Sequence, residues 1–481
     1  MSDSQSSNGS LEKKRDPERS VHEPDAAVAR NALLKIDLVV LPIVTMFYFL
    51  SFLDRSNIGN AKVAGLLKDL KMTPTQYSIA LTVTYVPYIV FELPSNLVLK
   101  RFGANVTLPL MVTLWGVVTA CQGAVTSYHG LLACRFFLGA VEGGLLPGLI
   151  LYLSSFYKRH QLQLRVALMF TATSLAGAFS GLLAAAISHM AGDRGKPGWA
   201  WIFILEGVFT TVFGIFAYFV MPRTVEETPF LTTAEREAVI ATKEEWVAEE
   251  EAETFSWSEV FSAFKEPHLW LLSPALFFNG TTLYGLAFFA PSIVSALGQS
   301  ANRSQLLTVP PYACAFVVSL IFAYLSDKYR QRGLVLITVS MIAIAGYGLF
   351  LGSAGKHNDY GALFLQVVGA YTSAPTVSAW QANNFQPHYK RATAIAWAFI
   401  LTNSGGILST WIFNDPPRYA KATKINLAFS VGIAACALGN MLYLRSQNIA
   451  KKKWLAENDE ASVEGDAKKL GNRHPNFQYT L

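Results

Sequence analysis

Residues 131–156 read LLACRFFLGAVEGGLLPGLILYLSSF, an apolar run with only two charged side chains, Arg135 and Glu142. A helix needs about 20 mostly apolar residues to cross the hydrocarbon layer of a membrane. In lipid, only a helix or a closed barrel satisfies its own backbone polar groups. The run therefore predicts a membrane-spanning helix.

Similar apolar runs occur along nearly the whole chain, in two sets of six on either side of the polar stretch 222–267. The predicted spans are Leu38–Leu53, Tyr77–Leu99, Val106–Val125, Leu131–Phe156, Val166–Met190, Trp201–Met221, Leu269–Leu297, Leu306–Leu325, Leu334–Leu351, Ala362–Phe385, Ala392–Phe413 and Ile425–Leu444. The 481 residues are 52% hydrophobic and only 15% charged, which lies outside the balance of soluble proteins. We therefore predict an all-α membrane protein with twelve transmembrane helices.

The polar segments divide the chain into five parts. We expect a disordered tail at 1–35, helical bundles at 36–221 and 268–445, an interdomain loop at 222–267 that contains a surface helix, and a solvated tail at 446–481. Lys and Arg near helix ends stay cytoplasmic, and the short loops on the two sides are nearly balanced. The basic residues of the tails decide the orientation, so we predict that both termini are cytoplasmic.

Composition argues against several other classes of protein. The basic residues behind the net charge of +6 lie at helix ends, so we expect no nucleic-acid partner. The four cysteines have the spacing of neither a zinc site nor a redox pair. The histidines are scattered singly in loops or at helix ends, which argues against a membrane enzyme. We expect no enzymatic activity, no metal and no cofactor.

Ionisable residues inside or at the edge of the spans are the strongest functional signal, because burying a charge in lipid is costly. Asp54 and Arg55 end the first span, although an interfacial pair reaching to water would look the same. Arg135 and Glu142 lie about two turns apart on one face of their helix. Arg55 can offer a two-pronged donor to a carboxylate. Burial disfavours the charged form of Glu142, which suits it to carry a proton. Asp54 can pair with Arg135, and we expect protonation of Glu142 or Asp54 to alter that pairing and so bias the two access states.

Polar side chains in other spans are secondary candidates for a substrate pocket. Amides in lipid need partners, whereas aromatic residues at helical spacing more often serve packing than ligand binding. The candidates are Tyr85, Tyr88, Asn279, Tyr284, Trp380, Asn383 and Asn403. Separately, the N-x-S sequence at Asn302 falls in a predicted external loop, where glycosylation is possible.

Four motifs in order along the chain carry a resemblance to a known family. They are LDRSNIGNA at 53–61, ELPSN at 92–96, the run from Arg135-Phe136 through Glu142-Gly143-Gly144 to Pro147-Gly148, and FNGTTLY at 278–284. Together they resemble the major facilitator superfamily and, within it, the fungal allantoate-permease branch of the anion:cation symporter family. The resemblance covers almost the whole chain.

This resemblance implies two pseudosymmetric six-helix bundles that rock around a site at the middle of the bilayer. It implies that Arg55 binds the substrate carboxylate, that Glu142 carries the coupled proton, and that Asp54 and Arg135 form a linked pair. Substrates of the family are organic acids, and its fungal branch is similar to importers of allantoate, nicotinate and pantothenate.

The superfamily's cytoplasmic signature G-x-x-x-D-R/K-x-G-R-R/K is only partly kept. Its first copy, at 96–105, has Lys100 where the acid belongs, whereas the second copy, at 323–332, keeps Asp327 with Lys328 and Arg332. We expect these three residues to form a gating contact that stabilises one access state. The alternative is a set of solvated loop charges, which contribute little.

Taken together, the residues and the resemblance predict a monomeric secondary active transporter in the plasma membrane. Its partners would be protons, a small organic anion and the lipid bilayer. Two other functions stay open: a nutrient sensor that binds without transporting, and an exporter of a secondary metabolite.

Overall fold

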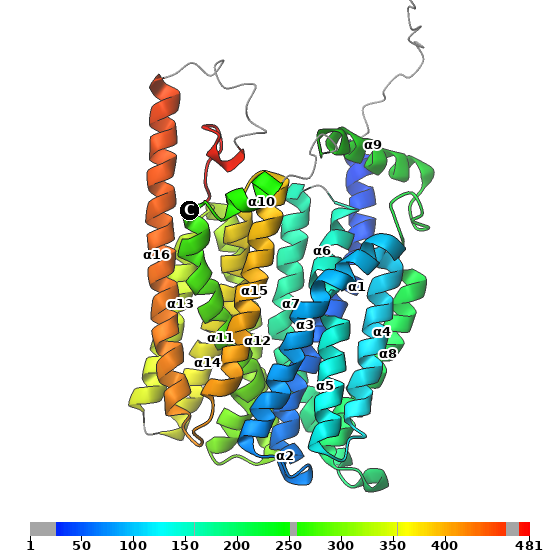
Figure 1. Cartoon of the computed structure of the whole chain (residues 1–481), viewed down its shortest axis with the longest axis vertical. Coiled ribbons are helices and arrows are strands. Elements are labelled where there is room, and N and C mark those ends of the chain that lie inside the picture. Colours follow the sequence, from blue (N-terminus) through cyan, green and yellow to red (C-terminus); the bar gives the residue numbers. More distant parts are fainter. Residues whose placement is uncertain (1–25, 158, 251–256, 354, 458–470) are drawn as a thin grey trace, which may run out of the picture.

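The computed structural model describes residues 26–157, 159–250, 257–353, 355–457 and 471–481, and it is built of helices (Figure 1). The first set of long helices comprises α1 (Ala26–Val63), α3 (Pro74–Phe102), α4 (Ala104–Gln122), the consecutive pair α5 (Tyr128–Glu142) and α6 (Leu145–Ser154), α7 (Arg159–Ile187) and α8 (Gly198–Val220). The second set comprises α11 (Pro267–Ala296), α12 (Ala301–Tyr329), α13 (Arg332–Gly352), α14 (Lys356–Asn383), α15 (His388–Ile412) and α16 (Ala420–Glu457).

Further helices lie between the long ones or after the last of them. They are α2 (Leu66–Asp69), two single 3₁₀ turns η1 (Ser188–Met190) and η2 (Asp193–Gly195), α9 (Thr233–Glu250), α10 (Trp257–Ala263) and η4 (Gly471–Arg473). The α9 helix lies at the end of the molecule where α1 begins, and α2 lies at the opposite end (Figure 1). We call these two ends the α9 side and the α2 side.

The prediction of twelve spans is confirmed within the described residues. Ten helices are long and apolar enough to cross a membrane by composition alone. The two that fall short are α3 and α14, which carry more polar residues but run parallel to the others in the same bundles. The predicted fourth span is broken at Gly143 and Gly144 into α5 and α6.

Two boundaries differ from the expectation. Helix α1 begins at Ala26, within the segment expected to be a disordered tail, and Lys35 on its first turns forms an ion pair of 2.8 Å with Glu235 of α9. The second tail is not solvated throughout, because α16 continues to Glu457 and residues 471–481 pack against the helical body, with Asn472 and Tyr479 buried. Residues 1–25 and 458–470 lie outside the described residues.

Side-chain burial shows how each helix meets lipid on one face and protein on the other. In α8 the buried residues, including Ile202, Phe203, Glu206 and Thr210, recur at spacings of three and four, whereas Val212, on the opposite face, is more than half exposed. This periodicity is that of a helix with one packed face, with the apolar face turned outward to lipid.

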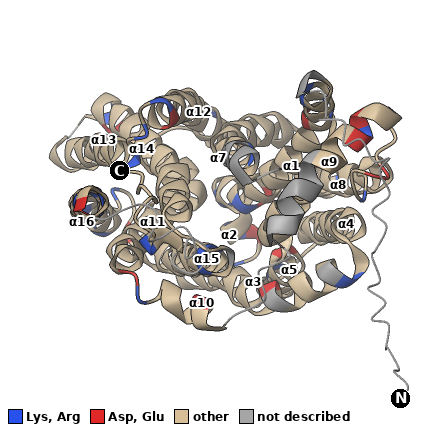
Figure 2. Cartoon of the chain, turned by 90° about the horizontal axis from the view of Figure 1, so that it is seen from above, with Lys and Arg blue, Asp and Glu red and all other residues tan. Residues whose placement is uncertain are grey.

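Seen from above, the first six spans occupy one side of the molecule and the last six the other (Figure 2). The two halves meet where α1 packs on α11, α7 on α12 and α3 on α15. At Gly59 the backbones of α1 and α11 come so close that a Cβ atom would lie 2.5 Å from the carbonyl oxygen of Phe288. Small residues at such contacts allow helices in membranes to pack tightly.

Candidate functional site

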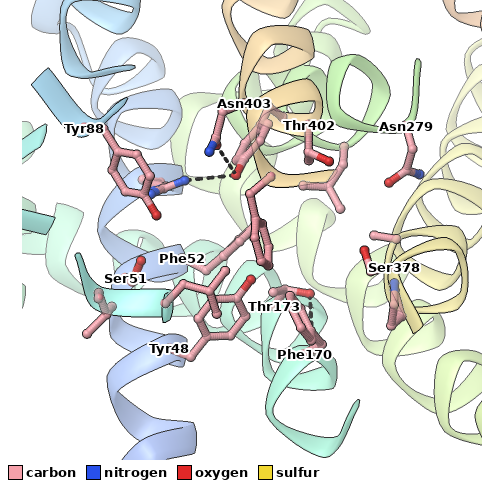
Figure 3. A pocket seen from close by; sticks show the side chains of 18 residues that line it. Tyr48, Ser51, Phe52, Tyr88, Phe170, Thr173, Asn279, Ser378, Thr402 and Asn403 are labelled. Atoms are coloured by element: carbon pink, nitrogen blue, oxygen red, sulfur yellow. Dashed lines mark hydrogen bonds between the residues drawn. The ribbon is translucent and has the colours of Figure 1, made fainter. Parts of the chain in front are cut away.

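A cavity of about 60 Å³ lies between the two halves, with walls drawn from both (Figure 3). The first half contributes side chains from α1, α3, α6 and α7, and the second half contributes them from α11, α14 and α15. Five of the residues predicted for the pocket line it: Arg55, Tyr88, Asn279, Tyr284 and Asn403. A cavity with mostly apolar walls and a few polar groups, at the junction of two bundles, is a typical place for a small-molecule site.

Arg55, which lines the cavity, forms an ion pair with Glu142; both residues are buried, and Glu142 is not among the lining residues. Nε of Arg55 donates to Oε1 of Glu142 at 2.9 Å, and its Nη2 lies 2.9 Å from the same oxygen. The hydroxyl of Ser51 donates to that oxygen as well. Charge-assisted contacts of this kind are about twice as strong as neutral hydrogen bonds, so Glu142 holds the guanidinium in place.

Arg55 also reaches across to the second half. Its Nη1 donates to the hydroxyl of Tyr284 at 3.0 Å, and that hydroxyl in turn donates to Oδ1 of Asn403 at 3.4 Å. The guanidinium stacks 4.7 Å from the centre of the Tyr88 ring, which supports a cation. One arginine thus contacts both bundles through polar groups that face the cavity.

Two further predicted pocket residues support this arrangement. Asn279 donates to the carbonyl of Ala370 at 3.1 Å and to the hydroxyl of Ser373, which ties α11 to α14 beside the cavity. Tyr85 is not among the lining residues, but its ring packs edge-on against Tyr284 with centres 5.6 Å apart. It therefore positions Tyr284.

The expected ion pair between Asp54 and Arg135 is not formed. Oδ2 of Asp54 instead accepts from Nε1 of Trp115 on α4 at 2.8 Å. Arg135 is buried with Nε and Nη2 lacking hydrogen-bond partners among the described residues, and its guanidinium lies 5.8 Å from the centre of the Phe203 ring. The two charges belong to one buried region without direct contact, because Asp54 points from α1 towards α4 rather than α5.

Trp380 and Asn383 were predicted for the pocket and lie elsewhere. Asn383 is the last residue of α14, at the α9 side. The buried indole of Trp380 donates to the carbonyl of Thr480 at 2.8 Å, and Asn384 exchanges two further hydrogen bonds with the same residue. The prediction failed because the position of a residue along a span does not reveal how deep it lies in the bundle.

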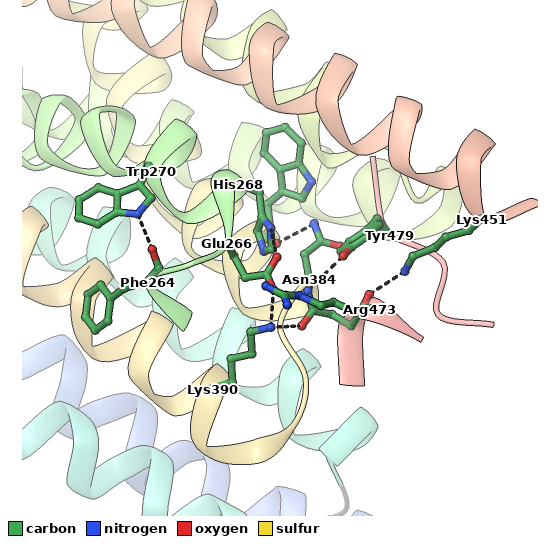
Figure 4. A network of polar contacts seen from close by, with 11 residues as sticks. Phe264, Glu266, His268, Trp270, Asn384, Lys390, Lys451, Arg473 and Tyr479 are labelled. Atoms are coloured by element: carbon green, nitrogen blue, oxygen red, sulfur yellow. Dashed lines mark hydrogen bonds and ion pairs between the residues drawn. The ribbon is translucent and has the colours of Figure 1, made fainter. Parts of the chain in front are cut away.

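The segment 471–481 is fastened by a network of polar contacts around Glu266 (Figure 4). Glu266 accepts from the buried Lys390 at 2.5 Å and from Arg473 at 2.9 Å, and Lys390 also donates to Asn472 at 2.7 Å. Burial alone would raise the pKa of Glu266, but the hydrogen bond and charge of Lys390 hold it below its usual value. Burial also raises the pKa of Tyr479 to about 12.

The residues expected to form a gate lie within the second half. Nη2 of Arg332 donates to Oδ1 of Asp327 at 2.7 Å across the turn from α12 to α13. Lys328 lies near the rings of Tyr324 and Tyr329 on the same turn. An ion pair between neighbouring helix ends of one bundle does not join the bundles, so in this conformation it fastens a turn rather than a gate.

Asn302 lies inside the first turn of α12 rather than in a loop. Its Nδ2, the atom that would carry a glycan, lies 3.1 Å from Nε2 of His189 on η1. The predicted loop is shorter than expected because α12 begins at Ala301. The side chain therefore contributes to a contact between the halves.

Two residues that sequence reasoning missed have clear roles in the geometry. Ser51 contacts Glu142 in the cavity, and Glu206 is buried on α8. Glu206 could have been found by the rule that singled out Glu142, because it is the only charged residue between Gly198 and Val220. Ser51 gives no such signal, since serines are common in spans.

Two bundles of spanning helices around a shared polar cavity define a membrane transporter, and the comparisons with known proteins agree. The chain belongs to the Major Facilitator Superfamily, whose family model matches residues 44–410. It is a transporter rather than an enzyme, and its relatives include fungal transporters of this superfamily.

Two relatives and one solved structure illustrate the similarity. An uncharacterized transporter of Schizosaccharomyces pombe is 36% identical over 94% of this chain and 90% of its own. The high-affinity nicotinic acid transporter of Saccharomyces cerevisiae is 31% identical over 95% of this chain and 86% of its own. A bacterial homologue of the human lysosomal transporter Spinster has a TM-score of 0.65 at 16% identity, covering 84% of this chain and 96% of that chain, and supports the fold.

Proposed function

We propose that the protein imports a small organic carboxylate together with a proton, as a monomer in the plasma membrane with both termini cytoplasmic. The observation that carries this proposal is the buried Arg55–Glu142 pair at the wall of a cavity between the two bundles. The likeness to a nicotinic acid transporter supports a carboxylate such as nicotinate as the substrate, with allantoate and related compounds as further candidates.

The geometry suggests how proton and anion are coupled. With Glu142 ionised, Nε and Nη2 of Arg55 are occupied by Oε1 of Glu142. A proton on Glu142 removes that counter-charge and releases the guanidinium to a substrate carboxylate, which restores charge balance in the cavity. Binding the anion without the proton would place two carboxylates around one buried guanidinium, which is costly. Proton and anion therefore bind cooperatively.

The contacts between halves support alternating access. At the α2 side, the hydroxyl of Thr82 on α3 lies 2.9 Å from that of Thr410 on α15, and Nε2 of Gln305 on α12 donates to the carbonyl of Asn60 on α1 at 3.3 Å. These contacts close the α2 side, which is extracellular in the proposed orientation. Breaking them and closing the α9 side would carry the cavity from one face of the membrane to the other.

The test is uptake by purified protein reconstituted in liposomes with acid outside and a neutral interior. We expect accumulation of labelled nicotinate, competition by other carboxylates and no competition by nicotinamide, which lacks the carboxylate. Glu142→Gln should abolish proton-driven accumulation and keep exchange, whereas Glu227→Gln, at an exposed acid on the connection after α8, should behave like the parent protein.

Each alternative has its own outcome in this assay. Movement of substrate towards the acidic side, in exchange for protons, would indicate an exporter. Binding of nicotinate without movement across the bilayer would indicate a sensor. Normal accumulation by Glu142→Gln would remove Glu142 from proton coupling.

A further inference from the structure

A second group of buried charges lies in the first half, beside the Arg55–Glu142 pair, since Asp54 directly precedes Arg55 on α1. Glu206 on α8 is 4% exposed; its Oε2 accepts from Nδ2 of Asn57, and its Oε1 has no hydrogen-bond partner among the described residues. Asp54 on α1, 3% exposed, leaves Oδ1 without a partner in the same part of the chain. On α5, Nε and Nη2 of Arg135 also lack hydrogen-bond partners among the described residues.

The charges of this group balance only when one of the two carboxyl groups binds a proton. The neighbouring α4 carries no Asp, Glu, Lys or Arg between Ala104 and Gln122, and the indole of its Trp115 donates to Asp54. The face of α7 near Asn57 presents the hydroxyl of Ser180, and His189 on η1 is occupied by Asn302. Arg55 is paired with Glu142. Arg135, which also has Tyr77 and Glu142 nearby, is then the cation available to Asp54 and Glu206. An ionised carboxylate buried without a counter-charge is strongly unfavourable, so one of the two takes up a proton.

A chain of hydrogen bonds leads from Glu206 to the contact between the halves. Asn57 donates to Glu206, Ser180 donates to Oδ1 of Asn57 at 3.2 Å, and Asn60 donates to Oγ of Ser180 at 2.7 Å. The backbone carbonyl of Asn60 then accepts from Gln305 of the second half at 3.3 Å. The side chains in this series of hydrogen bonds are all buried, and each donor points towards Glu206.

We propose that Glu206 and Asp54 form a second proton-binding site, and that its charge state sets the strength of the closure at the α2 side through Asn57, Ser180 and Asn60. This inference rests on the proposed function and adds to it a residue that controls access. An ionised Glu206 is a charge-assisted acceptor that orders the chain and favours closure. A protonated Glu206 accepts more weakly, so acid favours opening towards the α2 side, where substrate and protons would load.

The experiment follows opening directly and needs no substrate. The native cysteines are replaced by serine, and Thr410→Cys places a thiol in the closed contact at the α2 side, where Thr410 is fully buried. The rate of maleimide labelling, taken relative to that of a free thiol at the same pH because only the thiolate reacts, reports opening of that side. In the parent protein we expect this rate to rise about tenfold on acidification through the titration of one group.

Three variants separate this proposal from the proposed function. Glu206→Gln keeps an oxygen for Asn57 to bond, and we expect fast labelling that no longer depends on pH. Glu227→Gln, at an exposed position, should retain the pH dependence of the parent, whereas Glu142→Gln is measured by proton-driven accumulation, which decides the proposed function. If Glu206→Gln labels with the pH dependence of the parent, the proposal is overturned, while accumulation assays on Glu142→Gln still decide the proposed function.

A second measurement keeps the test valid if Glu206→Gln fails to fold. Hydrophobic carbodiimides add to protonated buried carboxyl groups, so in the parent protein the peptide containing Glu206 or Asp54 should be modified in acid and spared in alkali. Glu206→Asp, which keeps the carboxyl, should retain pH-dependent labelling with a shifted midpoint. Absence of modification at both residues across the pH range would exclude the second proton site.

Discussion

At the scale of single residues, the guanidinium of Arg55 connects the two halves of the cavity. It contacts Glu142 in its own bundle and Tyr284 in the other, so a change at this side chain affects both binding and the relation between the bundles. A guanidinium differs from an ammonium here because its planar fork meets two acceptors at once, whereas an ammonium acts as a point charge.

Arg55→Lys should therefore keep the positive charge and lose most uptake. Losing one charge-assisted hydrogen bond costs about 1.5–3 kcal/mol, which corresponds to a reduction of about tenfold to a hundredfold in affinity for the carboxylate. The measurement is direct binding of labelled nicotinate to detergent-solubilised protein, followed by initial uptake rates in liposomes. Unchanged affinity would show that Arg55 does not contact the substrate.

The residues of the cavity could be predicted from sequence only in part. Arg55 and Glu142 were found because a charge in an apolar run is conspicuous. Their pairing could not be predicted. The sequence does not show how α1 is rotated relative to α5, so it does not decide whether Glu142 or Arg135 lies next to the charged residues of α1. The assigned proton and substrate roles stay predictions until transport is measured.

At the scale of elements, the helices were predictable and their ends were not. Spans follow from length and hydropathy, which is why all twelve were expected. The extension of α1 back to Ala26 depends on its contact with α9 through Lys35 and Glu235, a tertiary contact that local sequence does not encode. The packing of residues 471–481 likewise depends on acceptors supplied by distant helices.

Helix packing around the cavity depends on small residues, and Gly139 provides the sharpest example. A Cβ atom at Gly139 on α5 would lie 2.0 Å from the carbonyl oxygen of Thr84 on α3. Gly139→Ala should therefore push the two helices apart and destabilise the first bundle by about 1–3 kcal/mol. Gly348→Ala on α13, where a Cβ meets nothing within 4 Å, is the matched control. Thermal unfolding should separate the two variants, and equal stability would contradict the close packing.

At the scale of the whole molecule, the segment 471–481 joins the α9-side ends of several helices in the second half. Arg473 and Asn472 share Glu266 and Lys390 with α11 and α15, while Trp380 and Asn384 hold Thr480. Among the described residues, the contacts of this segment given above all lie in the second bundle, which fits a bundle that moves as a rigid body.

Glu266→Gln should weaken this clasp in a pH-dependent way. The folded-state pKa of Glu266 lies below its ordinary value of 4.5, so its ion pairs contribute stability above that value, and the contribution is lost as pH falls through the folded-state pKa. We expect the variant to lose about 2 kcal/mol at neutral pH. The gap from the parent should narrow in acid below 4.5. Tryptophan fluorescence during thermal unfolding measures both, and a gap independent of pH would show that the charge of Glu266 is not responsible.

Motion of one bundle against the other can be tested by cross-linking two pairs of residues, one pair between the bundles and one pair within a bundle. His189 and Asn302 belong to different halves and touch at the α2 side, whereas Asp327 and Arg332 belong to the same half. In a background without native cysteines, a short bifunctional reagent across His189→Cys and Asn302→Cys should block uptake about tenfold or more and release it on cleavage, because the α2 side can no longer open. The same reagent across Asp327→Cys and Arg332→Cys should leave most uptake intact, since it joins residues that move together. If the second cross-link blocks transport as strongly as the first, the turn between α12 and α13 takes part in gating after all, and the rocking of two rigid bundles is insufficient to explain access.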